Sequence, residues 1–243
     1  MKEKIELSII AVVIDNQKVT ERFISSIRQY TKENYELILI DNGSKSKNAI
    51  DYFKKNSDKY FRFNKITDLA KAWNKGINLA EGKYIAVVNN DTVVPPKWFS
   101  ILKETLNKND KIGMVSPITY WLIKGFFEYG NLKNFDKTFS KPFKLKKFRD
   151  VVWGEFVIFN RKALEEIKGY NDIYKKLSAE DLEICFQLYS KNYEIWIDPR
   201  VFIYHQGGTS RDSNIREDKD IKTAYEENFK LFKSRWPRYT KGW

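Results

Sequence analysis

The N-terminal part of the chain alternates short hydrophobic runs with amphipathic segments. Three runs have the near-continuous apolar character of strands covered on both faces: residues 7–14 (LSIIAVVI), 35–40 (YELILI) and 84–88 (YIAVV). Apolar side chains recur at helical spacing over residues 19–30, 49–55 and 69–80, and residues 59–63 are typical of one more strand. Repeated strand–helix–strand units predict an α/β protein with a mostly parallel sheet and right-handed crossovers.

Polar side chains follow three of these strands at the point where each run ends. They are Asp15 and Asn16 after the first strand, Asp41 and Asn42 after the second, and Asn89, Asn90 and Asp91 after the last. Asn and Asp are common turn residues, so a turn explains any one cluster alone. Because the ends of parallel strands share one edge of the sheet, three clusters together favour a ligand cleft at that edge.

The second half of the chain carries two further polar clusters beside predicted elements. Residues 151–159 are strand-like, and we expect a helix from Ala179 with Ser178 as its N-cap. The first turn of that helix contains Glu180 and Asp181, a placement that the helix dipole alone also favours. His205, the only histidine, follows the apolar residues 201–204, and a turn histidine with a free side chain is the alternative interpretation. Residues 224–243 are expected to form a C-terminal helix and tail.

Composition and charge restrict the class of protein. The 243 residues suit one large or two small domains, and a single cysteine excludes a disulfide framework. No apolar run approaches the roughly 20 residues that a membrane span needs, and we expect no signal peptide and a cytoplasmic location. The net charge of +12 favours phosphate-bearing partners such as nucleotides, nucleic acid or anionic lipid. The chain has no Gly-x-Gly-x-x-Gly after its first strand and no Walker lysine loop, which argues against dinucleotide enzymes and P-loop NTPases.

Taken in order, the motifs resemble a family 2 glycosyltransferase with the GT-A fold. The stretches that carry the resemblance are SIIAVVIDN, YELILIDNGS, LAKAWNKGINLAEGKYIAVVNNDTVVPPKW, VWGEFVIFNRKALEEIKGYND, AEDLEICFQLYSKNYEIWIDP and VFIYHQGGTS. The resemblance implies a Rossmann-like, three-layer α/β/α architecture around a mostly parallel central sheet. It further implies one domain over residues 1–243, with a nucleotide-sugar half (1–92), an acceptor and catalytic half (93–215) and a C-terminal helix and tail (216–243).

The same resemblance implies a donor site for a UDP- or dTDP-sugar. Its nucleotide-sugar residues would be Asp15, Asn16, Asp41, Asn42, Asn74, Asn89, Asn90 and Arg211, with Asp41 on the base and Asn74 in the Ala-x-x-x-Asn-x-Gly helix. Asp91 and His205 would hold a divalent metal, Mn²⁺ or Mg²⁺, against the pyrophosphate. Asn89 stands where the family has the first acid of an Asp-x-Asp triplet, a departure that puts metal affinity in question. Arg211 is equally explained as a solvated surface charge.

Catalytic and acceptor residues follow from the resemblance in the same way. Asp181 would be the base of an inverting displacement, with Glu180 as its neighbour or substitute. Trp153, Gly154 and Glu155 would line the side that takes a saccharide or lipid-linked saccharide acceptor, although core packing explains Trp153 nearly as well. A non-catalytic module on this fold, or a basic nucleic-acid binder, is the alternative function, but we expect no nucleic acid.

Residues 120–150 show no regular pattern. Between 133 and 149, basic residues are interleaved with phenylalanines and a single acid. A variable acceptor loop kept soluble by its lysines is the favoured interpretation. Peripheral contact with an anionic membrane is the second and nucleic-acid contact the third.

Overall fold

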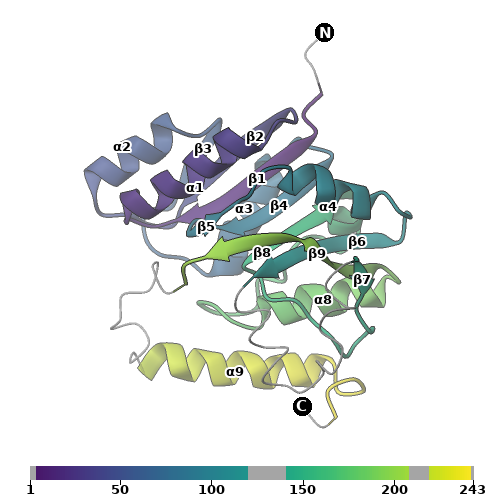
Figure 1. The fold of residues 1–243 in the computed structure, drawn as a ribbon. Coiled ribbons are helices and arrows are strands. Elements are labelled where there is room, and N and C mark those ends of the chain that lie inside the picture. The colour runs from purple at the N-terminus through teal and green to yellow at the C-terminus, as the bar shows by residue number, and fades with distance from the viewer. Residues whose placement is uncertain (1–3, 120–140, 208–218, 242–243) are drawn as a thin grey trace.

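The structure is a computed structural model that describes residues 4–119, 141–207 and 219–241 (Figure 1). Its strands are β1 (Leu7–Val13), β2 (Tyr35–Asp41), β3 (Lys59–Arg62), β4 (Tyr84–Asn89), β5 (Thr92–Val93), β6 (Ile112–Thr119), β7 (Phe143–Lys144), β8 (Phe156–Asn160) and β9 (Glu194–His205). Its helices are α1 (Gln17–Tyr30), α2 (Lys47–Lys55), α3 (Leu69–Leu79), α4 (Trp98–Leu106), α7 (Arg161–Glu166), α8 (Glu180–Ser190) and α9 (Lys219–Arg235).

The strands form one sheet in the order β3-β2-β1-β4-β8-β6-β9-β5, with β7 paired to β9. The first four are parallel, as the strand–helix–strand pattern predicts, and β6 and β9 are parallel to each other. β8 runs antiparallel between β4 and β6. The start of β8 therefore meets the same sheet edge as the carboxyl ends of β1, β2, β4 and β9.

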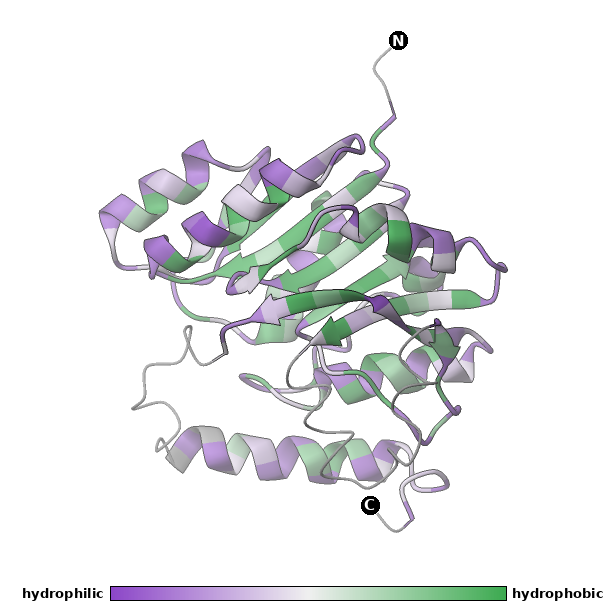
Figure 2. Cartoon of the chain, viewed as in Figure 1, coloured by the Kyte–Doolittle hydropathy of each residue, from purple (hydrophilic) through white to green (hydrophobic). Residues whose placement is uncertain are grey.

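Helices cover both faces of the sheet, which confirms the three-layer α/β/α expectation. α1, α2 and α4 pack on one face through buried residues such as Phe23, Phe53 and Trp98. α3, α7, α8 and α9 pack on the other, where Trp73 and Phe186 are buried. Figure 2 shows hydrophobic residues running along the strands between these two layers. Burial on both faces explains why the central strands are apolar at successive positions.

A close helix–sheet approach explains the Ala-x-x-x-Asn-x-Gly pattern of α3. A Cβ atom at Gly76 would lie 2.3 Å from Cγ2 of Ile10 in β1. Ala70 is buried on the same side of the helix. The small residues therefore let α3 pack directly on the central strand, beside the edge where the polar clusters lie.

Two local expectations were wrong. Ser178 does not cap α8: the N-cap is Ala179, in a left-handed conformation with φ of 65° and no side-chain cap hydrogen bond. The strand expected over residues 151–159 begins only at Phe156, so Trp153, Gly154 and Glu155 lie in the loop before β8. Apolar composition marked the region as buried but could not locate where backbone pairing starts.

Part of the 120–150 segment lies outside the described residues. Within the part that is described, β7 pairs with β9, a short strand that the sequence did not predict. Among the helices that the structure describes, none is long and apolar enough to cross a membrane.

Candidate active site

The loops after β1 and β2 are joined by hydrogen bonds at the carboxyl edge of the sheet. Oδ1 of Asp15 accepts from the backbone N–H groups of Lys45 and Ser46 at 2.9 and 2.8 Å, and the Asp15 N–H donates to Oγ of Ser44. Asp15 and Asn16 have φ of 42° and 43°, a left-handed conformation that non-glycine residues rarely adopt. The two clusters expected at this edge therefore form one connected structure held in a strained backbone.

Asp41 is buried beneath this loop rather than open to it. Its side chain has no exposed surface; Oδ1 accepts from the Ser44 N–H and Oδ2 accepts from the Tyr60 hydroxyl, both at 2.8 Å. Nε of Arg62 lies 3.4 Å from Oδ2. Asp41 thus shapes the β2 turn from below, and its contact with a base stays a prediction.

A cavity of about 620 Å³ lies above this turn. It is lined by Gly43, Ser44, Lys45, Arg62, Asn64, Lys65 and Ile66. Both polar atoms of the Asn42 side chain bond the backbone of Thr67, which fastens the 64–67 loop over the turn. Gly43 has φ of 90°, and a Cβ atom there would lie 2.7 Å from the Ile66 nitrogen, so only glycine fits. The cavity combines backbone polar groups with three cationic side chains.

The side chain of Asn74 connects two distant segments. Its amide nitrogen donates to the Tyr170 carbonyl at 2.7 Å, and its Oδ1 accepts from the Tyr170 N–H at 2.9 Å. This is a structural role that the sequence analysis did not assign. A nucleotide contact by Asn74 stays a prediction.

The triplet after β4 turns toward two different neighbours. Nδ2 of Asn90 donates to Oγ1 of Thr20 in α1 at 2.9 Å, which draws the β4 end to the helix after β1. Nδ2 of Asn89 lies 3.4 Å from Nε2 of His205, and Oδ1 of Asp91 lies 3.0 Å from the same nitrogen. The first and third members of the triplet therefore converge on the histidine that ends β9.

His205 is flanked by carboxylates on both ring nitrogens. Its Nε2 faces Asp91, and its Nδ1 lies 3.5 Å from Oε2 of Glu155. Burial disfavours the charged imidazole, but the two carboxylates outweigh burial and raise the pKa of His205 to about 9. Pairing between β5 and β9 sets Thr92 opposite His205, which is how the histidine reaches the end of β4.

The Asp91–His205 pair fits a divalent cation in part. The 3.0 Å between Oδ1 of Asp91 and Nε2 of His205 is the distance of a hydrogen-bonded ion pair, so a divalent cation would take the place of the Nε2 proton between these two atoms. Glu155 stands where a carboxylate commonly orients a metal-bound histidine. Among the described residues, no group of three or more His, Cys, Asp or Glu is arranged to hold a metal.

Asp181, in the first turn of α8, lies beside the loop that precedes β8. Its Oδ1 accepts from the Leu182 N–H at 2.8 Å, and Gly154 donates its backbone N–H to the same carboxylate. Burial raises the pKa of Asp181; the backbone N–H donors oppose that rise, and the Glu155 charge adds to it. A carboxylate that takes up a proton more readily than usual is suited to act as a base.

The other acids of this turn differ in their surroundings. Glu180 is largely buried. Glu183 has no exposed surface, and its carboxylate accepts from Arg235, Trp236 and Tyr174, so it is a structural group. Trp153, just before Gly154, is 51% exposed, which excludes the core-packing alternative.

The structure brings five of the residues that the sequence singled out into one line of contacts. Asp91, His205, Glu155, Gly154 and Asp181 follow one another in contact from the end of β4 to the start of α8. Arg211 lies outside the described residues. The sequence analysis missed Tyr60, Arg62 and Thr20. Arg62 is the last residue of β3, but that strand was predicted to run to residue 63, so a search for polar residues after the predicted strand end passes over it.

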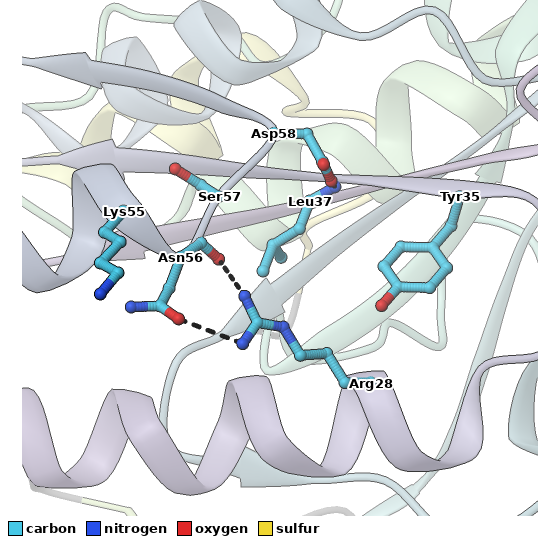
Figure 3. A pocket seen from close by; sticks show the side chains of 7 residues that line it. All are labelled: Arg28, Tyr35, Leu37, Lys55, Asn56, Ser57 and Asp58. Atoms are coloured by element: carbon cyan, nitrogen blue, oxygen red, sulfur yellow. Dashed lines mark hydrogen bonds between the residues drawn. The ribbon is translucent and has the colours of Figure 1, made fainter.

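A second cavity, of about 330 Å³, lies at the amino end of β2, away from these residues. Figure 3 shows it between Tyr35 and Leu37 of β2, Arg28 of α1 and the segment after α2. The Arg28 guanidinium already donates to the side chain and carbonyl of Asn56. Ligands of open α/β sheets bind at the carboxyl ends of the strands, so the other edge is the candidate site.

Comparison with known sequences identifies relatives of the chain. The profile of the family described as "Glycosyl transferase family 2" matches residues 8–168, more than half of the chain. The poly-beta-1,6-N-acetyl-D-glucosamine synthase of Staphylococcus epidermidis is 26% identical over 208 residues, covering 82% of this chain and 49% of that protein. A glycosyltransferase, GlyG, of Streptococcus pneumoniae is 27% identical over 108 residues, 43% of this chain and 36% of that protein. The chain spans about half the length, or less, of these two relatives.

Solved structures share the fold. GalNAc-T7, crystallised with UDP, GalNAc and Mn²⁺, superposes with a TM-score of 0.67 at 17% identity, over 83% of this chain and 43% of that one. The mannosyltransferase PcManGT of Pyrobaculum calidifontis, in complex with GDP-Man and Mn²⁺, superposes with a TM-score of 0.67 at 14% identity, over 84% and 57%. Both are GT-A glycosyltransferases, which confirms the fold class.

Proposed function

The chain belongs to glycosyl transferase family 2, and on that premise we propose that it is an inverting transferase that moves a sugar from a UDP- or dTDP-sugar to a saccharide or lipid-linked saccharide. The observation that carries the proposal is the line of contacts from Asp91 through His205 and Glu155 to Gly154 and Asp181. A leaving-group site and a basic group thereby lie at the same edge of one sheet. A relative named as a poly-beta-1,6-N-acetyl-D-glucosamine synthase supports a saccharide acceptor. A cytoplasmic location stays a prediction.

The donor nucleotide would occupy the cavity above the β2 turn. Arg62, Lys45 and Lys65 supply positive charge there, and the backbone of the turn supplies hydrogen-bonding groups. The pyrophosphate would then reach the β4 end, where Asp91 and His205 lie. Solved structures of the same fold that contain UDP or GDP-Man together with Mn²⁺ support a nucleotide-sugar donor for this chain.

The two ends of this line of contacts have different roles in the proposed reaction: Asp181 acts on the acceptor, and Asp91 acts on the leaving group. Asp181 takes the proton of an acceptor hydroxyl as the hydroxyl oxygen forms a bond to the anomeric carbon. The bond from that carbon to the phosphate oxygen breaks, and the nucleoside diphosphate leaves on the Asp91 side. Asp91 and His205 would hold a divalent cation, whose charge neutralises the departing diphosphate. Glu155 orients the His205 ring, and the Gly154 N–H holds the Asp181 carboxylate.

A thermal-shift screen of UDP-, dTDP- and GDP-sugars, each with and without Mn²⁺, tests the donor and the metal together. At a ligand concentration of 100 Kd, binding stabilises the folded state by about 2.7 kcal/mol, a rise of about 5–10 °C for a chain of this size. We expect that rise for a UDP- or dTDP-sugar in the presence of Mn²⁺. Asp91→Ala should abolish the metal-dependent part, whereas Asp110→Ala, an exposed acid at the other edge, should keep it. A screen in which no nucleotide sugar raises the melting temperature contradicts the proposal.

A further inference from the structure

The loop that leads into α8 has a strained backbone. Lys176, Ser178 and Ala179 have φ of 59°, 90° and 65°, in the region that side-chain-bearing residues rarely adopt. Ala179 is the N-cap of α8 and receives no side-chain capping bond. Asp181 follows two residues later, so the proposed base is carried on this strained segment. Such a conformation persists only where surrounding groups hold it in place.

Asn228 of α9 is one of the groups that hold this loop. It is only 3% exposed, and its Oδ1 accepts from the Lys175 N–H at 3.2 Å. Its amide nitrogen faces the carbonyl oxygens of Lys175, Leu177 and Ser178 at 2.9, 3.2 and 3.3 Å. One side chain on α9 therefore bonds three of the five residues of the 175–179 loop, among them the strained Ser178. On its other side the loop is bonded to the start of α3, where Asp68 accepts from the Lys176 N–H.

The far end of α9 is fastened to α8 itself. Arg235 donates from Nε and Nη2 to Oε1 of Glu183 at 3.0 and 2.8 Å, and Nε1 of Trp236 donates to Oε2 at 2.7 Å. Glu183 is fully buried in the first turns of α8, two residues from Asp181. α9 thus fixes both the loop before α8 and the helix itself, and Figure 1 shows α9 lying alongside α8 on the outside of the molecule.

We propose that Asn228 is a positioning residue for Asp181, holding the strained 175–179 loop so that the carboxylate meets the acceptor hydroxyl at the productive distance. The proposal rests on the proposed function, because it concerns the base of that reaction. Within the described part of the chain, the hydrogen bonds of the Asn228 side chain go to residues 175–178, and none goes to a residue that lines the donor cavity. Its loss should therefore affect transfer and spare donor binding.

The test compares Asn228→Ala with the unaltered chain by two measurements. The first is hydrogen exchange of residues 175–185, followed by mass spectrometry, without any ligand; we expect faster exchange there and little change in β1–β4. The second is steady-state transfer with the donor identified by the thermal-shift screen. Misplacing a catalytic group by about 1 Å costs roughly 100-fold in rate, so kcat should fall by about 10- to 100-fold. The donor KM and the Kd of UDP with Mn²⁺ should stay within about twofold. Such a change is small, because a tenfold change in affinity corresponds to about 1.4 kcal/mol of binding free energy.

Asn56→Ala is the matched control, because Asn56 also joins a helix to its neighbours by its side-chain amide but lies at the opposite edge. It should leave exchange of 175–185 and kcat unchanged.

If Asn228→Ala does not fold, Asn228→Ser, which keeps a short hydrogen-bond donor, replaces it. Unchanged exchange of 175–185, an unchanged kcat, or a donor KM that rises along with a fall in kcat would each overturn the proposal. If the unaltered chain transfers from no donor, the proposed function fails and the catalytic role of Asn228 with it. Faster exchange of residues 175–185 in Asn228→Ala would then show that Asn228 does hold the loop, and that only the proposed function is wrong.

Discussion

At the residue scale, the negative charge of Asp181 lowers the stability of the folded chain. Burial raises the pKa of its carboxyl, so the folded chain holds that proton to a higher pH than the unfolded chain does. Stability from this group is therefore fully present below the unfolded pKa of about 3.9 and is lost as pH rises through the raised folded pKa. Glu155 contributes to the shift, and Glu180, the Tyr170 hydroxyl and the Cys185 thiol are further titratable groups nearby. The charge that makes Asp181 a base is thus unfavourable for folding at neutral pH.

We predict that Asp181→Asn separates activity from stability. The amide oxygen can still accept from Leu182 and Gly154, but it cannot take a proton, so kcat should fall by about 10²- to 10⁴-fold while UDP binding is kept. The free energy of unfolding at pH 7 should exceed that of the unaltered chain, and the difference should vanish below about pH 4. Denaturant unfolding at several pH values, with steady-state kinetics, measures both.

Asp172→Asn is the control for this prediction, because Asp172 is an exposed acid a few residues before α8. It should change neither quantity. Normal transfer by Asp181→Asn would mean that another group is the base, with Glu180 the next candidate.

At the scale of elements, the site depends on how closely α3 packs against the sheet. Gly76 leaves no room for a Cβ atom beside Ile10, and Asn74 in the same helix bonds both backbone polar groups of Tyr170. Tyr170 in turn lies near Glu180 and Asp181, since both acids act on the pKa of its hydroxyl. α3 therefore joins β1 to the segment that carries Asp181, the proposed base.

We predict that Gly76→Ala destabilises the chain despite the better helix propensity of alanine. Overpacking costs about 1–3 kcal/mol and the propensity gain is about 1 kcal/mol, so the net loss should be up to about 2 kcal/mol. Chemical denaturation measures it. Asn78→Ala, at an exposed position of the same helix, should be neutral or slightly stabilising. A Gly76→Ala chain as stable as the unaltered one would show that α3 can move away from β1 without loss.

At the scale of the whole molecule, the net charge of +12 and the basic donor cavity act in the same direction. Lys45, Arg62 and Lys65 line that cavity, while Asp41 and Asp91 are buried and each lies beside a cationic side chain. A diphosphate approaching the site is therefore attracted both by the general field and by local cations. Salt screens such attraction, since the Debye length falls from about 10 Å at 0.1 M to about 3 Å at 1 M.

We predict that the affinity for UDP with Mn²⁺ falls by roughly tenfold between 0.05 and 0.5 M NaCl. Uridine, which lacks the diphosphate, should bind with little dependence on salt. Isothermal titration calorimetry at fixed Mn²⁺ measures both ligands. Equal salt dependence for UDP and uridine would mean that electrostatic attraction of the diphosphate contributes little to binding.

Several features of this protein were already determined by its sequence. Apolar runs, helical spacing and polar residues at strand ends placed Asp15, Asp41 and Asp91 at one edge of an α/β sheet. Those inferences work because periodicity and strand ends are local properties, and parallel crossovers leave few topologies. The ordered motifs added the family and the GT-A fold.

Only the tertiary structure decided which of these residues meet. Asp91 lies beside His205, and Glu155 reaches the same ring because β8 is inserted antiparallel between β4 and β6. Asn74 proved to hold Tyr170, 96 residues later, and Asn228 to hold a loop some 50 residues earlier. Such pairings depend on side chains brought together by packing between distant segments, and no local pattern of hydrophobic and polar residues encodes them.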